Sequence, residues 1–254
     1  EWNPDEEFNV MIFQKHVKEI MEDIYNRGKI PILVGGTGFY IQAVLNDIAF
    51  TKEKQGDEIR ADLQNLAKEK GASYLHHELQ KVDKESAEAI HPNNIKRVIR
   101  ALEYFQSTGQ KFSDHNKEER QKGSPYNFLY LVLTMNRKVL YERIDKRVDQ
   151  MMEEGLVKEV KQLLDAGYSR NLVSMQGLGY KEIASALFKE CTMEEAVYRL
   201  KRDTRHFAKR QMTWFRRERD VTMINKDNFS NNHEIVNYIM KLAVEKGICS
   251  CREG

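Results

Sequence analysis

Apolar residues recur at helical spacing near the start of the chain and then gather into a short continuous run. The helical positions are Val10, Phe13, Val17, Ile20, Met21 and Ile24. The run at 29–34, Lys-Ile-Pro-Ile-Leu-Val, predicts a buried strand, and a glycine turn and a second helix follow it up to Leu45. The order helix, strand, glycine turn, helix is typical of an α/β domain.

The composition changes after Asn46. Residues 51–123 are rich in Lys, Glu, Gln and His and predict helices at about 57–70, 73–80, 84–89 and 94–108. The α/β rhythm then resumes, with strands at 128–134 and 221–225 and helices at 138–154, 158–166 and 232–246; Gly167 is the expected left-handed cap of the second of these helices. We therefore expect an α/β core in two parts, 1–50 and 124–254, interrupted by a helical insertion at 51–123.

The predicted sheet is short of strands. A buried parallel strand needs neighbours on both sides, and the pattern supplies little beyond the three runs at 29–34, 128–134 and 221–224. We therefore expect that residues belonging to this core precede Glu1.

Composition sets broad limits. The 254 residues are 41% hydrophobic, which is enough for a substantial core, and 41 basic residues against 39 acidic ones give a net charge of only +2. No run approaches the length of a membrane span, and nothing at the N-terminus reads as a signal peptide. The three cysteines make no disulfide framework, so we expect a reducing cytoplasm, and the seven histidines show no metal-ligand spacing.

Positive charge is concentrated at 197–219, a segment that contains nine Lys and Arg residues but only two acidic residues. On a helix, Arg202, Arg205, Lys209 and Arg216 share one side, and Val197, Leu200, Phe207, Trp214 and Phe215 share the other. The alternative is a solvated basic face, but so many like charges on one helix repel one another. We therefore expect one side to pack and the other to contact the phosphates of a polyanion.

Three further segments could meet anions. The turn at 35–40 is either ligand-facing or purely structural, and it lacks the Lys-Ser/Thr of a Walker loop. Arg143 and Arg147, one helical turn apart, suit a diphosphate, although the pattern alone favours ion pairs with neighbouring acids of the same helix. Lys96, Arg97 and Arg100 lie in the first turns of a helix, where cations oppose the helix dipole.

Five blocks together resemble one family, the tRNA dimethylallyltransferases, also called tRNA isopentenyltransferases. They are Gly35-Gly-Thr-Gly-Phe-Tyr40, Lys96-Arg-Val-Ile-Arg-Ala-Leu-Glu103, Arg143-Ile-Asp-Lys-Arg147, Gly177-Leu-Gly-Tyr-Lys-Glu182 and Lys209-Arg-Gln-Met-Thr-Trp-Phe-Arg216. The blocks follow the family's order and spacing as far as about Asn225, and the last of them is highly specific.

The resemblance implies a P-loop nucleotide-kinase-like parallel α/β core with an all-helical insertion that grips the anticodon stem-loop of tRNA. It implies transfer of a dimethylallyl group from dimethylallyl diphosphate to the exocyclic N6 amine of the adenine next to the anticodon on its 3′ side, with Mg²⁺ assisting the diphosphate. The family's phosphate loop and catalytic aspartate would lie before Glu1. We therefore expect this chain to be inactive by itself, and to be a monomer with no membrane partner.

The resemblance also implies roles for individual residues. Thr37, Arg143 and Arg147 are expected in catalysis, and Gly35, Gly36, Thr37, Arg143 and Arg147 at the diphosphate. The expected tRNA contacts are Arg60, Asn93, Asn94, Ile95, Lys96, Arg97, Arg100, Gln176, Gly177, Gly179, Tyr180, Lys181, Arg205, Lys209, Arg210, Gln211, Thr213, Trp214 and Arg216. Two alternatives stay open: an adenylate prenyltransferase, which would need neither the insertion nor the basic helix, and an RNA-binding protein without catalysis.

Overall fold

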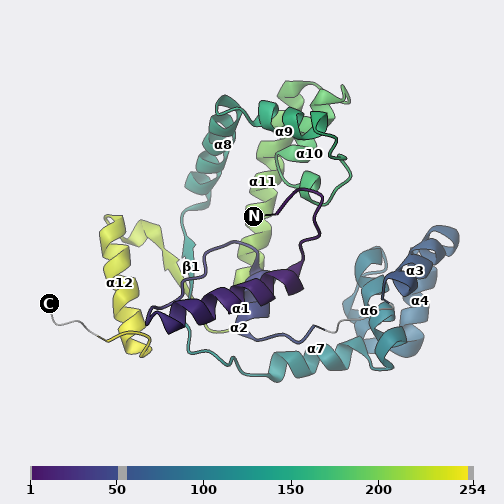
Figure 1. Ribbon diagram of the computed structural model, residues 1–254, viewed down its shortest axis with the longest axis horizontal. Coiled ribbons are helices and arrows are strands. Elements are labelled where there is room, and N and C mark those ends of the chain that lie inside the picture. Colours follow the sequence, from purple (N-terminus) through teal and green to yellow (C-terminus); the bar gives the residue numbers. More distant parts are fainter. Residues whose placement is uncertain (1, 51–55, 251–254) are drawn as a thin grey trace. The chain divides into compact units, whose positions relative to one another are not determined.

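The computed structural model describes residues 2–50 and 56–250 of the chain. It contains two compact units (Figure 1). Unit 1 comprises Glu1–Ile41 and Tyr126–Gly254, and unit 2 comprises Gln42–Pro125. Unit 2 spans the residues 51–123 for which a helical insertion is expected, and it begins earlier in the sequence, within the helix that follows the glycine turn. The assignment of this unit as an insertion domain stays a prediction.

The first helices lie where the apolar pattern puts them. Helix α1, Val10–Asn26, confirms the predicted helix and begins at Asn9, whose side chain accepts hydrogen bonds from the amides of Met11 and Ile12. Helix α2, Gly38–Leu45, follows the glycine turn as expected.

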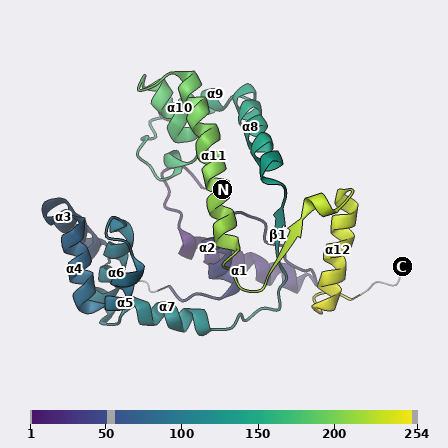
Figure 2. The ribbon, with the colours of Figure 1, turned by 180° about the vertical axis from the view of Figure 1, so that it is seen from behind.

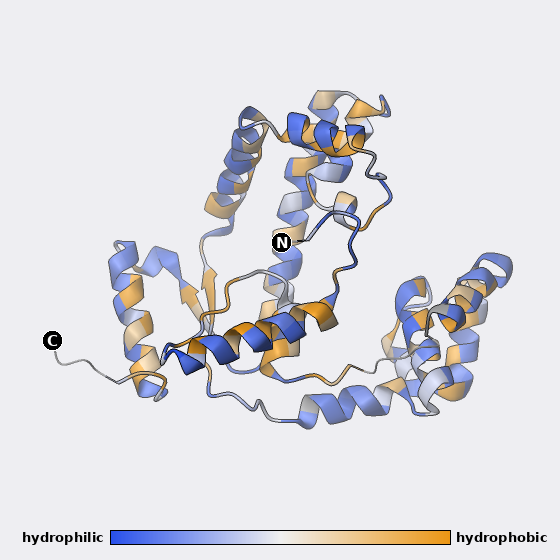
Figure 3. Ribbon diagram, viewed as in Figure 1, coloured by the Kyte–Doolittle hydropathy of each residue, from blue (hydrophilic) through white to orange (hydrophobic). Residues whose placement is uncertain are grey.

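Two of the three predicted strands are present. Strands β1, Tyr130–Thr134, and β2, Val221–Asn225, pair in parallel with Tyr130 opposite Val221, and both are coloured as hydrophobic in Figure 3. The strand predicted at 29–34 is wrong: in the described part of the chain the sheet has two strands, and this segment belongs to neither. Strand structure requires hydrogen bonds to a neighbour, and here Ile32 and Val34 are 83% and 87% exposed instead.

Five helical segments pack together in unit 1. They are α8 (Arg137–Glu153), α9 (Leu156–Asp165), the 3₁₀ turn η1 (Ser174–Gln176), α10 (Tyr180–Leu187) and α11 (Met193–Phe215). The four α-helices lie near one another in both Figure 1 and Figure 2. Their core includes Val148, Val160, Met175, Ile183 and Leu200. The expected cap Gly167 has φ +92°, which confirms its left-handed conformation.

The remainder of unit 1 follows β2. A 3₁₀ turn, η2 (Lys226–Asn228), leads to the predicted C-terminal helix α12 (Asn232–Glu245). No helix in residues 2–50 and 56–250 combines the length and the apolar character that crossing a membrane would require.

Unit 2 is all-helical within its described residues. Helices α3 (Gly56–Lys70), α4 (Ala72–Val82), α5 (Lys84–Ala89) and α6 (Ile95–Thr108) confirm the four predicted there, and their apolar faces meet in a core that includes Leu75, Leu79 and Val98. A fifth helix, α7 (Phe112–Gln121), was not predicted separately, because its sequence is almost entirely polar.

Asp83 links two of these helices. Its buried carboxylate caps α5 by accepting a hydrogen bond from the amide of Ser86 at 3.0 Å, and it accepts another from the amide of Ser113 in α7 at 2.8 Å. The fold as a whole is a mostly helical α/β structure with a small parallel sheet, and the P-loop character of the core stays a prediction.

Candidate functional site

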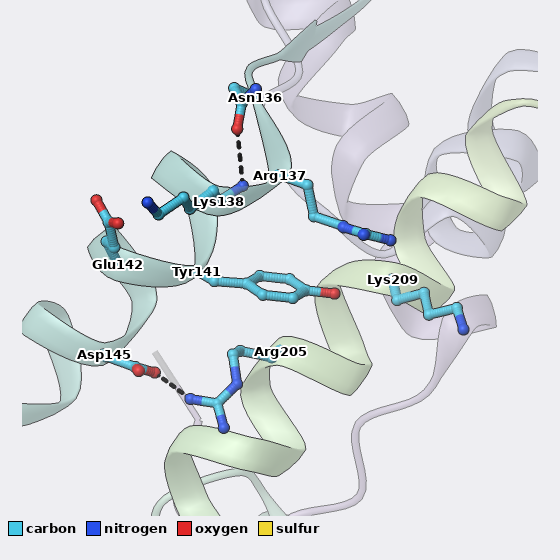
Figure 4. Close-up of a pocket in the computed structure, with 8 residues that line it drawn as sticks. All are labelled: Asn136, Arg137, Lys138, Tyr141, Glu142, Asp145, Arg205 and Lys209. Carbon is cyan, nitrogen blue, oxygen red and sulfur yellow. Dashed lines mark hydrogen bonds and ion pairs between the residues drawn. The ribbon is translucent and has the colours of Figure 1, made fainter.

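A pocket of about 770 Å³ opens between α8 and α11 (Figure 4). It is lined by Asn136, Arg137, Lys138, Tyr141, Glu142, Asp145, Arg205 and Lys209. Four of these residues are cationic and two are acidic, so the lining has a net positive charge. Arg137 and Tyr141 extend from α8 toward α11, whereas Lys138 and Glu142 point away.

The pocket lies just after the end of β1. Asn136 holds this turn, because its side chain accepts a hydrogen bond from the amide of Lys138 at 2.9 Å while its own amide donates to Asp227 Oδ2 at 2.6 Å. Asp227 follows β2, so the turn is held at the carboxyl ends of both parallel strands. Ligands of open α/β sheets bind at this end.

Ion pairs join the two helices that form the pocket. Arg205 of α11 pairs with Asp145 of α8 (Figure 4), and Lys201 pairs with Asp149 at 2.5 Å. The sequence pattern alone favoured ion pairs between these two acids and the arginines of their own helix. In the structure both acids pair with α11 instead.

The predicted diphosphate pair lies outside the pocket lining. Arg143 and Arg147 are exposed on α8, and Arg143 donates to the sulfur of Met135 at 3.7 Å. Neither guanidinium forms an ion pair in residues 2–50 and 56–250. Both side chains are free to meet an anion.

The basic helix α11 is neutralised along its first half only. Four cations have acidic partners: Arg199 with Glu195, Lys201 with Asp149, Arg202 with Asp203 and Arg205 with Asp145. By contrast Lys209, Arg216 and Arg217 are exposed and have no ion pair among the described residues. Positive charge therefore remains available to a ligand at Lys209 and just after the end of the helix.

The apolar side of α11 is less buried than predicted. Leu200 and Phe215 are buried, but Phe207 and Trp214 are 38% and 39% exposed. Arg210 lies over the ring of Phe207, 5.7 Å from its centroid. Thr213 is also exposed, and its hydroxyl donates to the carbonyl of Lys209 at 3.0 Å. Exposed rings beside cations are the kind of surface on which nucleobases stack.

The glycine turn at 35–38 packs directly on α11. The side-chain amide of Gln211 donates to the carbonyl of Gly36 at 2.8 Å. A Cβ atom on Gly36 would lie 2.3 Å from Gln211 Nε2, and one on Gly38 would lie 2.2 Å from Trp214 Cδ1. The second and third glycines of the turn are therefore needed for packing. This favours the structural interpretation for them, whereas Gly35 and Thr37 are exposed.

The segment at 176–181 is held by its own contacts. Gly179 has φ +100°, which a side chain would disfavour, and the side-chain amide of Gln176 donates to the carbonyl of Arg170 at 2.7 Å. The hydroxyl of Tyr180 donates to Glu159, and this bond together with burial raises the pKa of Tyr180 to about 12. Gly177 and Lys181 complete the segment, and Lys181 lies beside Glu182.

The candidate residues of unit 2 fall into two groups. Arg60 binds the buried carboxylate of Glu103 at 2.8 Å, and Arg100 approaches the same group at 3.4 Å. At the start of α6, Ile95 is half-buried, and the residues around it are exposed: Asn93, Asn94, Lys96 and Arg97. The side chain of Asn94 makes no capping hydrogen bond there. The start of α6 is therefore the better candidate for contact with an external anion.

Sequence reasoning did not single out Arg137, Lys138 and Tyr141, which line the pocket. The available signal was their position directly after a predicted strand. No group of three or more His, Cys, Asp or Glu side chains in residues 2–50 and 56–250 could hold a metal ion.

Comparison with known proteins identifies the family. The model of the family described as IPP transferase matches residues 1–218. A tRNA dimethylallyltransferase of Lachnoclostridium phytofermentans is 55% identical over 98% of this chain and 79% of its own length, and that of Acetivibrio thermocellus is 48% identical over 93% and 75%.

Solved structures agree. The full-length tRNA isopentenylpyrophosphate transferase of Bacillus halodurans is 41% identical, with a TM-score of 0.67 over 97% of this chain and 77% of that one. A eukaryotic dimethylallyltransferase described as acting on tRNA is 27% identical, with a TM-score of 0.76 over 95% and 64%. The chain belongs to the IPP transferase family, and its enzyme class is that of the tRNA dimethylallyltransferases.

Proposed function

We propose that this protein transfers a dimethylallyl group from dimethylallyl diphosphate to the N6 amine of the adenine next to the tRNA anticodon on its 3′ side. The observation that carries the proposal is the cationic pocket between α8 and α11, whose lining includes Lys209, a lysine with no ion pair among the described residues. A single-stranded RNA loop needs this combination of phosphate-binding cations and exposed rings.

In the proposed reaction the adenine N6 forms a bond to C1 of the prenyl group while the C1–O bond to diphosphate breaks. The leaving diphosphate gains negative charge, which cations must meet. Arg143 and Arg147 are suited to this task because their guanidiniums are exposed and unpaired in the described structure. The proton leaves N6 to a general base.

The RNA is proposed to cross the second half of α11. Lys209 and Arg205 would meet phosphates at the pocket, and Trp214 or Phe207 would offer a ring to an unstacked base. The exposed Lys96 and Arg97 at the start of α6 would bind the anticodon stem-loop from unit 2. Arg199, Lys201 and Arg202 already have acidic partners, so they are expected to contribute less to RNA binding than the unpaired Lys209.

Mg²⁺ stays part of the proposal as an ion carried by the diphosphate, since the described residues form no cluster that would hold it. No step here depends on it. The matches over 98% of the chain give no support to the expectation that the chain is inactive by itself.

The test is incorporation of radiolabelled dimethylallyl into an anticodon stem-loop RNA by the full-length protein. The expected result is labelled N6-modified adenine at the predicted position. A folded protein that binds the stem-loop without incorporating label would favour the RNA-binding alternative. A protein that labels AMP in preference to the stem-loop would favour the adenylate prenyltransferase.

A further inference from the structure

A second pocket, of about 460 Å³, lies on unit 1 apart from the one between α8 and α11. Its lining comes from the segment before α10, from α10 itself and from α11: Arg170, Gln176, Lys181, Glu182, Ala184, Ser185, Arg199, Arg202 and Asp203. We propose that this pocket binds one nucleotide of the RNA and that Glu182 accepts a hydrogen bond from the exocyclic amino group of its base. The inference rests on the proposed RNA substrate.

Glu182 has a buried carboxylate, and one of its two oxygens has no hydrogen-bond donor among the described residues. Its residue is 6% exposed, and Oε2 accepts a hydrogen bond from the amide of Gly179 at 2.9 Å. Oε1 is buried and has no hydrogen-bond donor in the described structure. Lys181 Nζ lies 3.4 Å from Oε1, near enough for attraction between the charges, but without hydrogen-bond geometry. A buried carboxylate oxygen without a donor is costly, so a ligand that supplied one would bind favourably.

Capping of helix α10 accounts for only one of the two oxygens of the Glu182 carboxylate. The Glu182 carboxylate caps the start of α10 by accepting from the main-chain amide of Gly179, and that role uses Oε2. A glutamine would cap equally well through its single carbonyl oxygen. The cap therefore gives no reason for a second, negatively charged oxygen on a residue that lines a pocket.

The rest of the pocket is suited to phosphate. Arg170, Arg199 and Arg202 each pair with one carboxylate, that of Glu190, Glu195 and Asp203 respectively. Each guanidinium has five N–H donors, so these pairs leave donors for a further anion.

A phosphate alone would not suit Oε1, because two anions repel each other. A nucleotide supplies both features, an anionic phosphate for the arginines and a neutral amino donor for Oε1. Adenine, cytosine and guanine carry such an amino group. Uracil has no amino group. Its only base-edge donor is an imino N–H, and the two carbonyl oxygens beside this N–H would be repelled by a carboxylate.

The substitution Glu182→Gln separates hydrogen bonding from charge. It keeps the acceptor for Gly179 and turns the free oxygen into an NH₂ donor, while making the pocket more positive. If only charge mattered, anticodon stem-loop RNA would bind more tightly. If Glu182 accepts from an amino group, the dissociation constant should rise about 10- to 100-fold.

A matched control is Glu195→Gln, which changes the charge equally beside the same pocket but leaves Glu182 intact; it should bind RNA as tightly as the unaltered chain or more so. Circular dichroism checks that both variants fold. In a second arm, each loop base with an amino group is replaced in turn by an analogue without one. At one position the replacement should weaken binding to the unaltered chain and have no further effect on the Glu182→Gln variant.

Unchanged or tighter binding by the Glu182→Gln variant would overturn the inference, as would the absence of any loop position coupled to it. If the unaltered chain binds no stem-loop at all, the proposed RNA substrate fails first. That outcome is distinct, because the Glu182→Gln comparison requires measurable binding to begin with.

Discussion

The glycine turn gives a prediction that the structure makes quantitative. Gly35, Gly36 and Gly38 are close in sequence but differ in what an added methyl group would meet. At Gly35 nothing lies within 4 Å, at Gly36 the nearest atom is the flexible end of Gln211, and at Gly38 the methyl would lie 2.2 Å from Trp214 Cδ1 and 2.9 Å from its Cγ. The indole cannot move away from Gly38 without a change of rotamer, since Cγ is close to the main chain.

The expected losses of unfolding free energy follow this order. Gly38→Ala forces overpacking that typically costs about 1–3 kcal/mol, partly offset by roughly 0.5–1 kcal/mol because alanine favours the helix. A net loss of about 1–2 kcal/mol is expected. Gly36→Ala should cost less, because Gln211 can swing aside and lose only its hydrogen bond to the Gly36 carbonyl, worth about 1 kcal/mol. Gly35→Ala should be neutral or slightly stabilising.

Urea unfolding followed by tryptophan fluorescence measures this order directly. The chain has two tryptophans, Trp2 and Trp214, and both belong to unit 1. In a double-mutant cycle, Trp214→Ala should remove most of the penalty of Gly38→Ala. Equal losses for Gly35→Ala and Gly38→Ala, or no coupling between Gly38 and Trp214, would refute the packing argument and return the turn to its ligand-facing interpretation.

Three further predictions concern Asp83, Arg143 and Arg60. Burial raises the pKa of Asp83, but hydrogen bonds from Ser86 and Ser113 outweigh it and hold the pKa below its usual 3.8. Its contribution to stability is therefore present above that value and lost as the pH falls through the lower folded pKa. Asp83→Asn should cost about 1–3 kcal/mol at neutral pH and flatten the acid side of a stability profile measured by circular dichroism. Arg143→Ala should lower turnover of the full gene product by tenfold or more while sparing stem-loop affinity, and the reverse result would assign Arg143 to the RNA. Arg60→Ala leaves Arg100 as the one remaining cation beside the buried Glu103 among the described ion pairs. Because Arg60 is itself half exposed, we expect the free energy of unfolding, measured by thermal denaturation, to fall by about 1–2 kcal/mol. No fall would show that Arg60 is not needed for stability and is available to bind RNA.

Local pattern predicted most of the helices, because a helix makes its hydrogen bonds within its own segment. Helix α5 and strand β2 lie where the sequence placed them, whereas the segment at 29–34 has the composition of a strand but no neighbour with which to pair. A strand depends on residues far away in the chain, and composition cannot supply them.

The candidate site was only partly predictable for a similar reason. The charge pattern identified Arg205 and Lys209, but it could not show that Asp145 pairs with Arg205 from another helix or that Arg137 joins them in one pocket. It could not foresee that Gln211 and Trp214 of the most specific block would pack on the glycine turn. Such contacts between segments distant in sequence follow from tertiary packing.

The most direct test of the central claim is the salt dependence of anticodon stem-loop binding to Arg205→Ala/Lys209→Ala. Removing two phosphate contacts should weaken binding and reduce the slope of log K against log salt concentration by roughly 1.4 to 1.8. Two controls separate this from general charge: Lys241→Ala, on α12, should leave the slope unchanged, and Asp145→Asn, which releases Arg205, should not weaken binding. A slope unaltered in the double variant would contradict the account and place the RNA on another surface.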